Sequence, residues 1–334
     1  GGVAVTPAVA LSVAEQSTIA ATGSASHVSV GGDVDIKSAH TGSVTTLAAG
    51  NSEATNVAVG AAMALATVGD SSEARLGGSL QSKGHVSLEA RNDTSSTTVA
   101  EASVRGGQEE DAETPADGVD KKLQEQTSLA QRKKEETKGV DGDEPLANVP
   151  SAQSDEGQAS VAAAISANLS TATTRAHTAD GASIAAEGRL SISSLGNYGT
   201  LAKADGSAVD ATSATVGVGA AVAVNQVTAV NEAYVSSGQY AAQGITIEAK
   251  MLPDARAKSG AEATSGAGSS KVGIAGALAL HVIDSVTAAQ IRDGASVNAQ
   301  GSDVVLTAEG KSQHKAGALP DKEGAGGGSV GIGA

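Results

Sequence analysis

A serine between glycines near the end of the chain has the spacing of a catalytic nucleophile. Gly327-Gly328-Ser329-Val330-Gly331 fits the G-x-S-x-G pattern, in which a strand-turn-helix corner exposes a serine hydroxyl for acyl transfer. In related copies of the surrounding sequence, the serine position holds Thr215 or Lys271, which a nucleophile would not share. We therefore interpret the pattern as a glycine-rich turn, and we predict no catalytic residue in this chain.

Metal ligation is equally weakly supported by the residue types. The chain has no cysteine and no H-E-x-x-H pair. Its six histidines are dispersed: His27, His40, His85, His177, His281 and His314. Asp33-Val34-Asp35 and Asp141-Gly142-Asp143 offer paired carboxylates, but EF-hand and calcium-nonapeptide spacings are absent. We expect these acids to be solvated, and we predict no metal and no cofactor.

Charge and composition limit the partners of the chain. A formal net charge of −15 argues against nucleic acid and against adsorption to an anionic membrane. The most apolar window, 216–230, is too short to span a bilayer as a helix, so we expect no membrane insertion. Phe and Trp are absent and only three Tyr occur, so Ala, Val, Ile and Leu carry the apolar fraction. This material favours a thin, regular core.

The segments that would position any site recur with a fixed period. The stretch 216–224 reads VGVGAAVAV, and its copies lie about 55 residues apart. The copies begin at Val3, Val57, Val161, Val216, Val272 and Val330. The step from Val57 to Val161 is nearly double. Such a period is typical of a solenoid, and because both ends fall inside a repeat we expect an excerpt from a longer chain.

Each copy alternates large and small residues with a period of two, which indicates a β-strand. The small residues in three copies are Ala58, Gly60, Ala62, Ala64, Gly217, Gly219, Ala221, Ala223, Gly273, Ala275, Ala277 and Ala279. Gly and Ala are poor strand formers, so a whole face of them indicates close approach of another backbone. We predict packing against another layer of the same chain. Lateral association with a neighbouring rod, or simple tolerance, are the alternatives.

The remainder of each repeat predicts glycine turns and further short strands. Turns are expected at Asp180-Gly181, Ser237-Gly238 and Asp293-Gly294, where glycine supplies a positive φ. The fold class that follows is all-β, a parallel β-solenoid of about 55-residue repeats, with a sandwich or propeller as rivals. If one coil takes half a repeat, the chain forms about ten coils, a rod of about 50 Å at ~4.8 Å per strand.

An insertion of different composition accounts for the double step. It covers 105–158, is rich in Asp, Glu, Lys and Arg, and contains Pro115, Pro145 and Pro150. Low hydrophobicity with high charge predicts a solvated loop or a weakly held helix. The expected organisation is solenoid repeats at 1–104, the insertion, and repeats again at 159–334. The alternative is a partner-binding protrusion that presents Lys121, Lys122, Arg132, Lys133 and Lys134.

The repeats resemble a known family. VGVGAAVAVNQVTAVNEAYV at 216–235, a glycine turn, and then Gly244-Ile245-Thr246-Ile247-Glu248-Ala249 resemble the passenger repeats of giant bacterial surface adhesins. These are the filamentous-haemagglutinin-like and leukotoxin-like proteins exported by type V routes. The resemblance covers the repeats on both sides of the insertion. It implies a right-handed β-helix, an extracellular or cell-surface location, and a receptor on a host or neighbouring cell, or other copies of the chain, as partner.

These inferences converge on a non-enzymatic role. We expect a structural or adhesive shaft segment of a large extracellular surface protein. One alternative is a self-assembling extracellular filament subunit, favoured if the incomplete terminal repeats join end to end. The other is a β-helical glycan-active enzyme, which would show carboxylates grouped along a groove.

Overall fold

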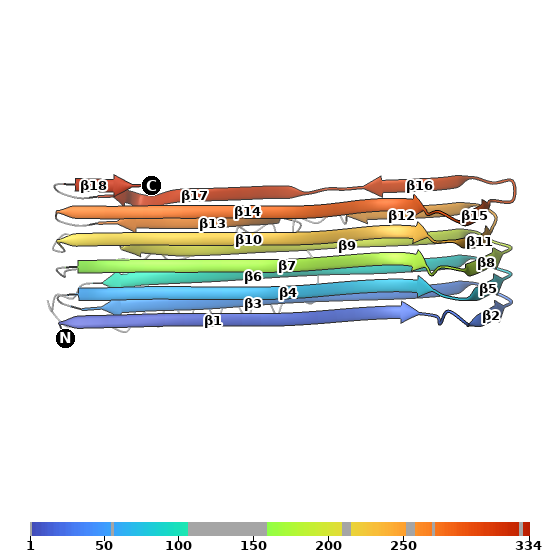
Figure 1. The fold of residues 1–334 in the computed structure, drawn as a ribbon, viewed down its shortest axis with the longest axis horizontal. Coiled ribbons are helices and arrows are strands. Elements are labelled where there is room, and N and C mark those ends of the chain that lie inside the picture. The colour runs from blue at the N-terminus through green and yellow to red at the C-terminus, as the bar shows by residue number, and fades with distance from the viewer. Residues whose placement is uncertain are drawn as a thin grey trace.

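A computed structural model describes residues 2–54, 57–105, 159–208, 215–251, 258–268, 271–326 and 330–334. These residues form a β-solenoid in which each coil contributes in turn to three parallel sheets (Figure 1). No helix occurs in the described ranges. The prediction of an all-β solenoid is confirmed.

The first sheet, which we call the front sheet, contains the long strand that opens each repeat. Its strands are β1 (Val3–Ala21), β4 (Val57–Leu76), β7 (Ala159–Thr178), β10 (Val216–Val235), β14 (Val272–Ile291) and β18 (Val330–Gly333), paired in that order. The register is unbroken, so equivalent residues of successive repeats form columns across the sheet. Aligning the repeats therefore identifies the strand partners.

A short end sheet and a long back sheet complete each coil. The end sheet contains β2 (His27–Val30), β5 (Ser79–Ser82), β8 (Ala182–Ala186), β11 (Gly238–Ala241) and β15 (Ala295–Asn298). The back sheet contains β3 (Val34–Glu53), β6 (Val86–Arg105), β9 (Leu190–Ala208), β12 (Ile245–Met251), β13 (Lys258–Ala267), β16 (Val304–Glu309) and β17 (Gln313–Ala325). Gly181, Gly238 and Gly294 have positive φ at the turns into the end sheet, as predicted.

One repeat makes one coil, so the prediction of two coils per repeat was wrong. Strand β10 runs through the polar residues Asn225 and Gln226 without a break and is 20 residues long. Such a strand extends about 66 Å at ~3.3 Å per residue, whereas the six stacked strands span about 24 Å at ~4.8 Å. The described coils form a slab that is longest along its strands (Figure 1), not a narrow ten-coil rod.

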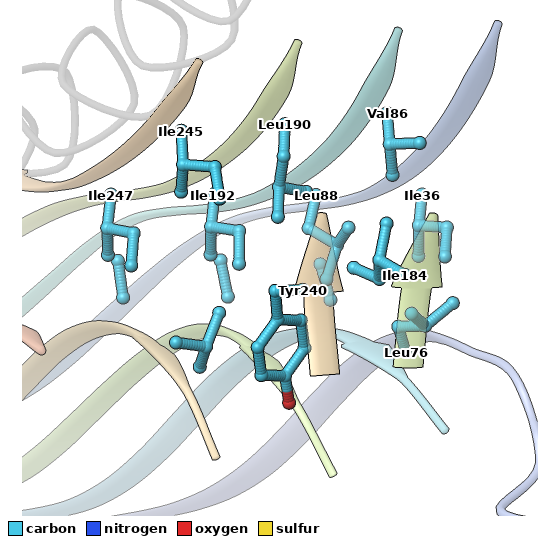
Figure 2. Close-up of a cluster of buried hydrophobic side chains, with 14 of the residues drawn as sticks. Ile36, Leu76, Val86, Leu88, Ile184, Leu190, Ile192, Tyr240, Ile245 and Ile247 are labelled. Carbon is cyan, nitrogen blue, oxygen red and sulfur yellow. The ribbon is translucent and has the colours of Figure 1, made fainter. Parts of the chain in front are cut away.

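The interior changes in thickness along the slab. Where the three sheets meet, large side chains stack in rows from coil to coil, including Ile36, Leu76, Leu88, Ile184, Ile192, Tyr240 and Ile247 (Figure 2). Farther along, the front and back sheets face each other directly, and the buried cluster between them is almost entirely alanine. The coil therefore tapers from a three-sided section to a thin two-layer strip.

The small-residue face of the front sheet lies inside this thin strip. Ala58, Ala64 and Ala223 are fully buried, and in β14 Ala277 and Ala279 are partly buried. A Cβ atom on Gly219 would lie 2.0 Å from the carbonyl oxygen of Gly266 in the back sheet. The backbone that approaches these residues thus belongs to the same chain, and the face does not lie on the outer surface where a neighbouring rod would meet it.

Candidate interaction face and polar clusters

Burial of the small residues turns the large residues of the same strands outward, because side chains alternate across a strand. Met63, Ile165 and Leu278 are 45%, 47% and 58% exposed. We define the apolar face by three columns of outward side chains on the front sheet. The columns are Val5, Val59, Val161, Val218 and Ile274; Val9, Met63, Ile165, Val222 and Leu278; and Leu11, Leu65, Ala167, Val224 and Leu280. This outer face is toward the reader in Figure 1.

The apolar face has a regular relief. Between its first two columns runs a column of small or compact residues: Pro7, Ala61, Ala163, Ala220 and Gly276. The first two columns are ridges, because their side chains are larger than those of the column between them on all five long strands. The relief repeats from coil to coil because the strands stay in register.

The area of this face is large for an exposed surface. Together with the flanking outward columns, from that of Val3 to that of Val13, it spans about 33 Å along the strands and about 19 Å across five strands, hence about 630 Å². Monomeric proteins rarely expose apolar patches beyond about 300–600 Å², and larger patches mark interaction sites. The outer face of the back sheet is polar instead. There, Glu262 joins Lys203 and Lys315 at 3.3 Å and 2.9 Å in a ladder across coils.

A charged and aromatic ladder bounds the apolar face toward the end sheet. Arg175 contacts Glu232 at 3.0 Å, and the Arg292 guanidinium lies 3.3 Å from the Tyr234 ring centroid. His177 stacks on Tyr234 with ring centroids 4.7 Å apart. These groups satisfy one another across adjacent coils, so the ladder is a polar border rather than an open site.

Three interior residues have the order of a nucleophile, a base and an acid. Thr18 Oγ1 lies 3.2 Å from His40 Nδ1, and His40 Nε2 lies 3.3 Å from Asp70 Oδ1. Burial raises the pKa of Asp70, although the neighbouring His40 opposes the shift. His40 and Asp70 are buried between the sheets, and a Cβ on Gly42 would lie 3.0 Å from His40 Nε2. The trio has no room for a substrate and instead pins the two sheets together.

The structure brings together two histidines that are 33 residues apart in sequence. His281 Nε2 and His314 Nδ1 lie 3.4 Å apart between the front and back sheets, and Asn225 and Ser259 contact His281. Burial and the neighbouring His281 lower the pKa of His314. The spacing of His281 and His314 in the sequence does not predict their contact, because the contact depends on which columns of the two sheets face each other. Within the described ranges, no group of three or more metal-binding side chains forms.

The acids weighed as calcium ligands have other partners. Asp33 Oδ1 accepts a hydrogen bond from the backbone nitrogen of His85 at 2.7 Å, and Asp35 lies 3.5 Å from Lys37 Nζ. Asp33 thus links a turn to the next coil. Asp141 and Asp143 lie outside the described residues.

A shallow groove of about 310 Å³ crosses the end sheet. Its polar lining consists of serine hydroxyls and side-chain amides, from Ser79, Gln81, Ser183, Gln239, Ser296 and Asn298 among others. These groups donate and accept hydrogen bonds, but the lining includes no carboxylate. The groove therefore lacks the acid pair that glycoside hydrolysis uses.

The remaining sequence-based candidates fall outside the described residues. These are Ser329 of the G-x-S-x-G pattern and the predicted partner loop with Lys121, Lys122, Arg132, Lys133 and Lys134. Val330–Gly333, directly after that serine, is a strand in register with Val272, where a nucleophile elbow would begin a helix.

In the parts of the chain that are described, no helix has the length and hydropathy to cross a membrane. The chain matches no protein-family model, no curated protein and no solved structure.

Proposed function

We propose that this chain is a structural shaft segment of a large extracellular surface protein. The observation that carries the proposal is the unbroken register of the front sheet. Strands β4 and β7 pair along their whole length although the insertion separates them in sequence. Each coil therefore presents the same strand edges to the next coil, and the length of the shaft increases with the number of coils.

The location and partners in this proposal rest on the resemblance of the repeats to giant adhesin passengers. That resemblance supports a bacterial cell-surface or secreted protein without catalysis. The partner is then a receptor on a host or neighbouring cell, or further copies of the chain. The net charge of −15 agrees with a partner other than nucleic acid.

Surface labelling of the source cells tests this function directly. Antibodies raised against the purified chain should label intact cells, and mild shearing should release the antigen. Labelling that needs permeabilised cells would refute the proposal. Small-angle scattering tests the architecture separately, with a maximum dimension of at least about 66 Å expected from the strand length.

A glycan-active enzyme is the weaker candidate on this geometry. The end-sheet groove supplies hydroxyl and amide groups but no carboxylate pair among its lining residues. Release of reducing sugar from extracellular polysaccharides by the purified chain, lost on substitution of Gln239, would favour this function over the shaft.

A further inference from the structure

We propose that the apolar face of the front sheet is a docking surface for a second copy of this chain. The face presents about 630 Å², so a pair of copies would bury about 1,260 Å², which lies at the lower end of the range of about 1,200–2,000 Å² for stable protein–protein interfaces. Its outward residues, on five successive long strands, are Val, Leu, Ile, Met and Ala with Pro7, Gly276 and two polar residues, Thr67 and Gln226. The inference concerns association only and stands apart from the cellular role proposed above.

The small column of the face can accept a large column of a second copy. In a face-to-face pair, a two-fold axis parallel to the coil stack and midway between the Ala163 and Ile165 columns reverses the strand direction of the second copy. The Ile165 column of one copy then lies over the small Ala163 column of the other, and the reciprocal contact follows from symmetry. The same axis places the Val161 column over the Ala167 column, where large side chains of the two copies meet end to end. Packed sheets gain their contact area by such interdigitation, at a separation of about 10 Å.

Charge also selects this face for self-association. The chain carries a net charge of −15, so two copies repel each other over most approaches. From the column of Val3 to the column of Val13, however, no outward residue of the five long strands is charged. The charged ladder around Glu232 lies beyond this area. Two copies can therefore meet here without burying an unpaired charge.

A lipid surface fits the same face less well. Membrane-surface elements combine an apolar face with flanking Lys or Arg and with interfacial Trp or Tyr. The two arginines that flank the face, Arg175 and Arg292, are both paired with Glu232, and no aromatic or basic residue lies among the columns of the face. A second copy needs neither.

The test compares charge insertions on the two outer faces of the slab. In the first variant, Ile165→Lys and Val222→Lys place two ammonium groups in adjacent strands of the ridge. In the matched control, Leu47→Lys places one on the outer face of the back sheet, where Leu47 is 39% exposed. Sedimentation velocity over a concentration series measures the mass of each full-length chain, and far-UV circular dichroism checks that each variant is folded.

We expect the wild-type chain and Leu47→Lys to form dimers with matching dissociation constants. The double ridge variant should remain folded and bind itself at least about 100-fold more weakly, because each pair would bury uncompensated charges. A wild-type chain that stays monomeric up to about 100 µM, a concentration well above a micromolar dissociation constant, overturns the proposal. Equal dimerisation of all three chains overturns it as well, since the interface then lies elsewhere.

A flotation assay with phosphatidylcholine vesicles resolves the rival occupant. Dimeric wild-type chain that does not float agrees with the proposal. Monomeric chain that floats, and loses flotation in the double ridge variant, assigns the face to lipid and overturns it. None of these outcomes depends on whether antibodies label intact cells, so failure of the docking surface and failure of the proposed function are distinguishable.

Discussion

Adding one methyl group to Gly219 should disrupt the thin part of the slab. The Cβ atom of Gly219→Ala would lie 2.0 Å from the carbonyl oxygen of Gly266 and 2.7 Å from that of Gly206. Both obstacles are backbone atoms of the back sheet, so no side-chain rotation relieves them. The two sheets would have to separate locally, which would loosen the alanine packing on either side.

The expected cost exceeds that of ordinary overpacking. Inserting a methylene into a packed core costs about 1–3 kcal/mol, and obstacles made of backbone place this site at about 3 kcal/mol or above. Gly276→Ala is the matched control, one strand away in the same sheet. Its Cβ would point outward, with the nearest atom, the carbonyl oxygen of Ala334, at 4.0 Å. This substitution should be neutral or slightly stabilising, because alanine lowers the conformational entropy of the unfolded chain.

Urea unfolding followed by circular dichroism compares the two variants. A loss of about 3 kcal/mol at a slope near 3 kcal/mol per molar shifts the midpoint by about 1 M. Amide exchange should also rise in β9, β10 and β13 for Gly219→Ala, because coils contact chiefly their neighbours. Coincident midpoints for Gly219→Ala and Gly276→Ala would refute the close approach of the two sheets.

Three further predictions concern buried and paired polar groups. Tyr240→Phe removes a buried hydroxyl that makes hydrogen bonds with Thr178 and Ser236. The substitution should lower the free energy of unfolding, measured by urea titration, by about 1–2 kcal/mol. Unchanged stability would mean that those hydrogen bonds do not form. Because burial raises the pKa of Asp70 above 3.8, the native state binds this proton more tightly than the unfolded state. The stability that this group contributes should therefore fall as pH rises from about 4 through the raised pKa, and Asp70→Asn should abolish that component in melts at pH 4 and 6. Burial tends to raise the pKa of Glu262, but Lys315 and Lys203 outweigh this effect and lower the pKa. The free energy that ionised Glu262 contributes to folding is therefore present above pH 4.5 and should be lost on acidification through the lowered pKa. The same acid titration of Glu262→Gln should lack that loss.

Strand formation and strand partners could be predicted from local pattern alone. The alternation in VGVGAAVAV at 216–224 requires a strand, and the glycine after Asp180 or Asp293 marks a turn. In-register stacking then places each residue beside its equivalent in the next repeat. The pairing of Val216 with Val272 follows from the period without reference to any distant segment.

Coil length and the match between sheets could not be predicted in this way. Asn225 resembles a strand break, yet its amide donates to the carbonyl oxygen of Thr200 at 3.1 Å across the interior. Large residues usually face a core, and alternation alone does not state which face of β10 is buried. That choice depends on the small residues of the back sheet, such as Gly206, which leave room only for another small face. The meeting of His281 with His314 depends on the same tertiary match.

The strip-like section gives the slab direction-dependent mechanics. The bending stiffness of a strip rises with the cube of its dimension in the plane of bending. With a width of about 66 Å and a thickness of about 20 Å, two sheets plus their outer side chains, stiffness differs about tenfold between the two planes. A shaft of such coils would bend mainly in the plane that contains its thin dimension. Joining two copies through the apolar face doubles the thickness and raises the weaker stiffness about eightfold if the layers do not slip, because two sheets bonded face to face bend as one body.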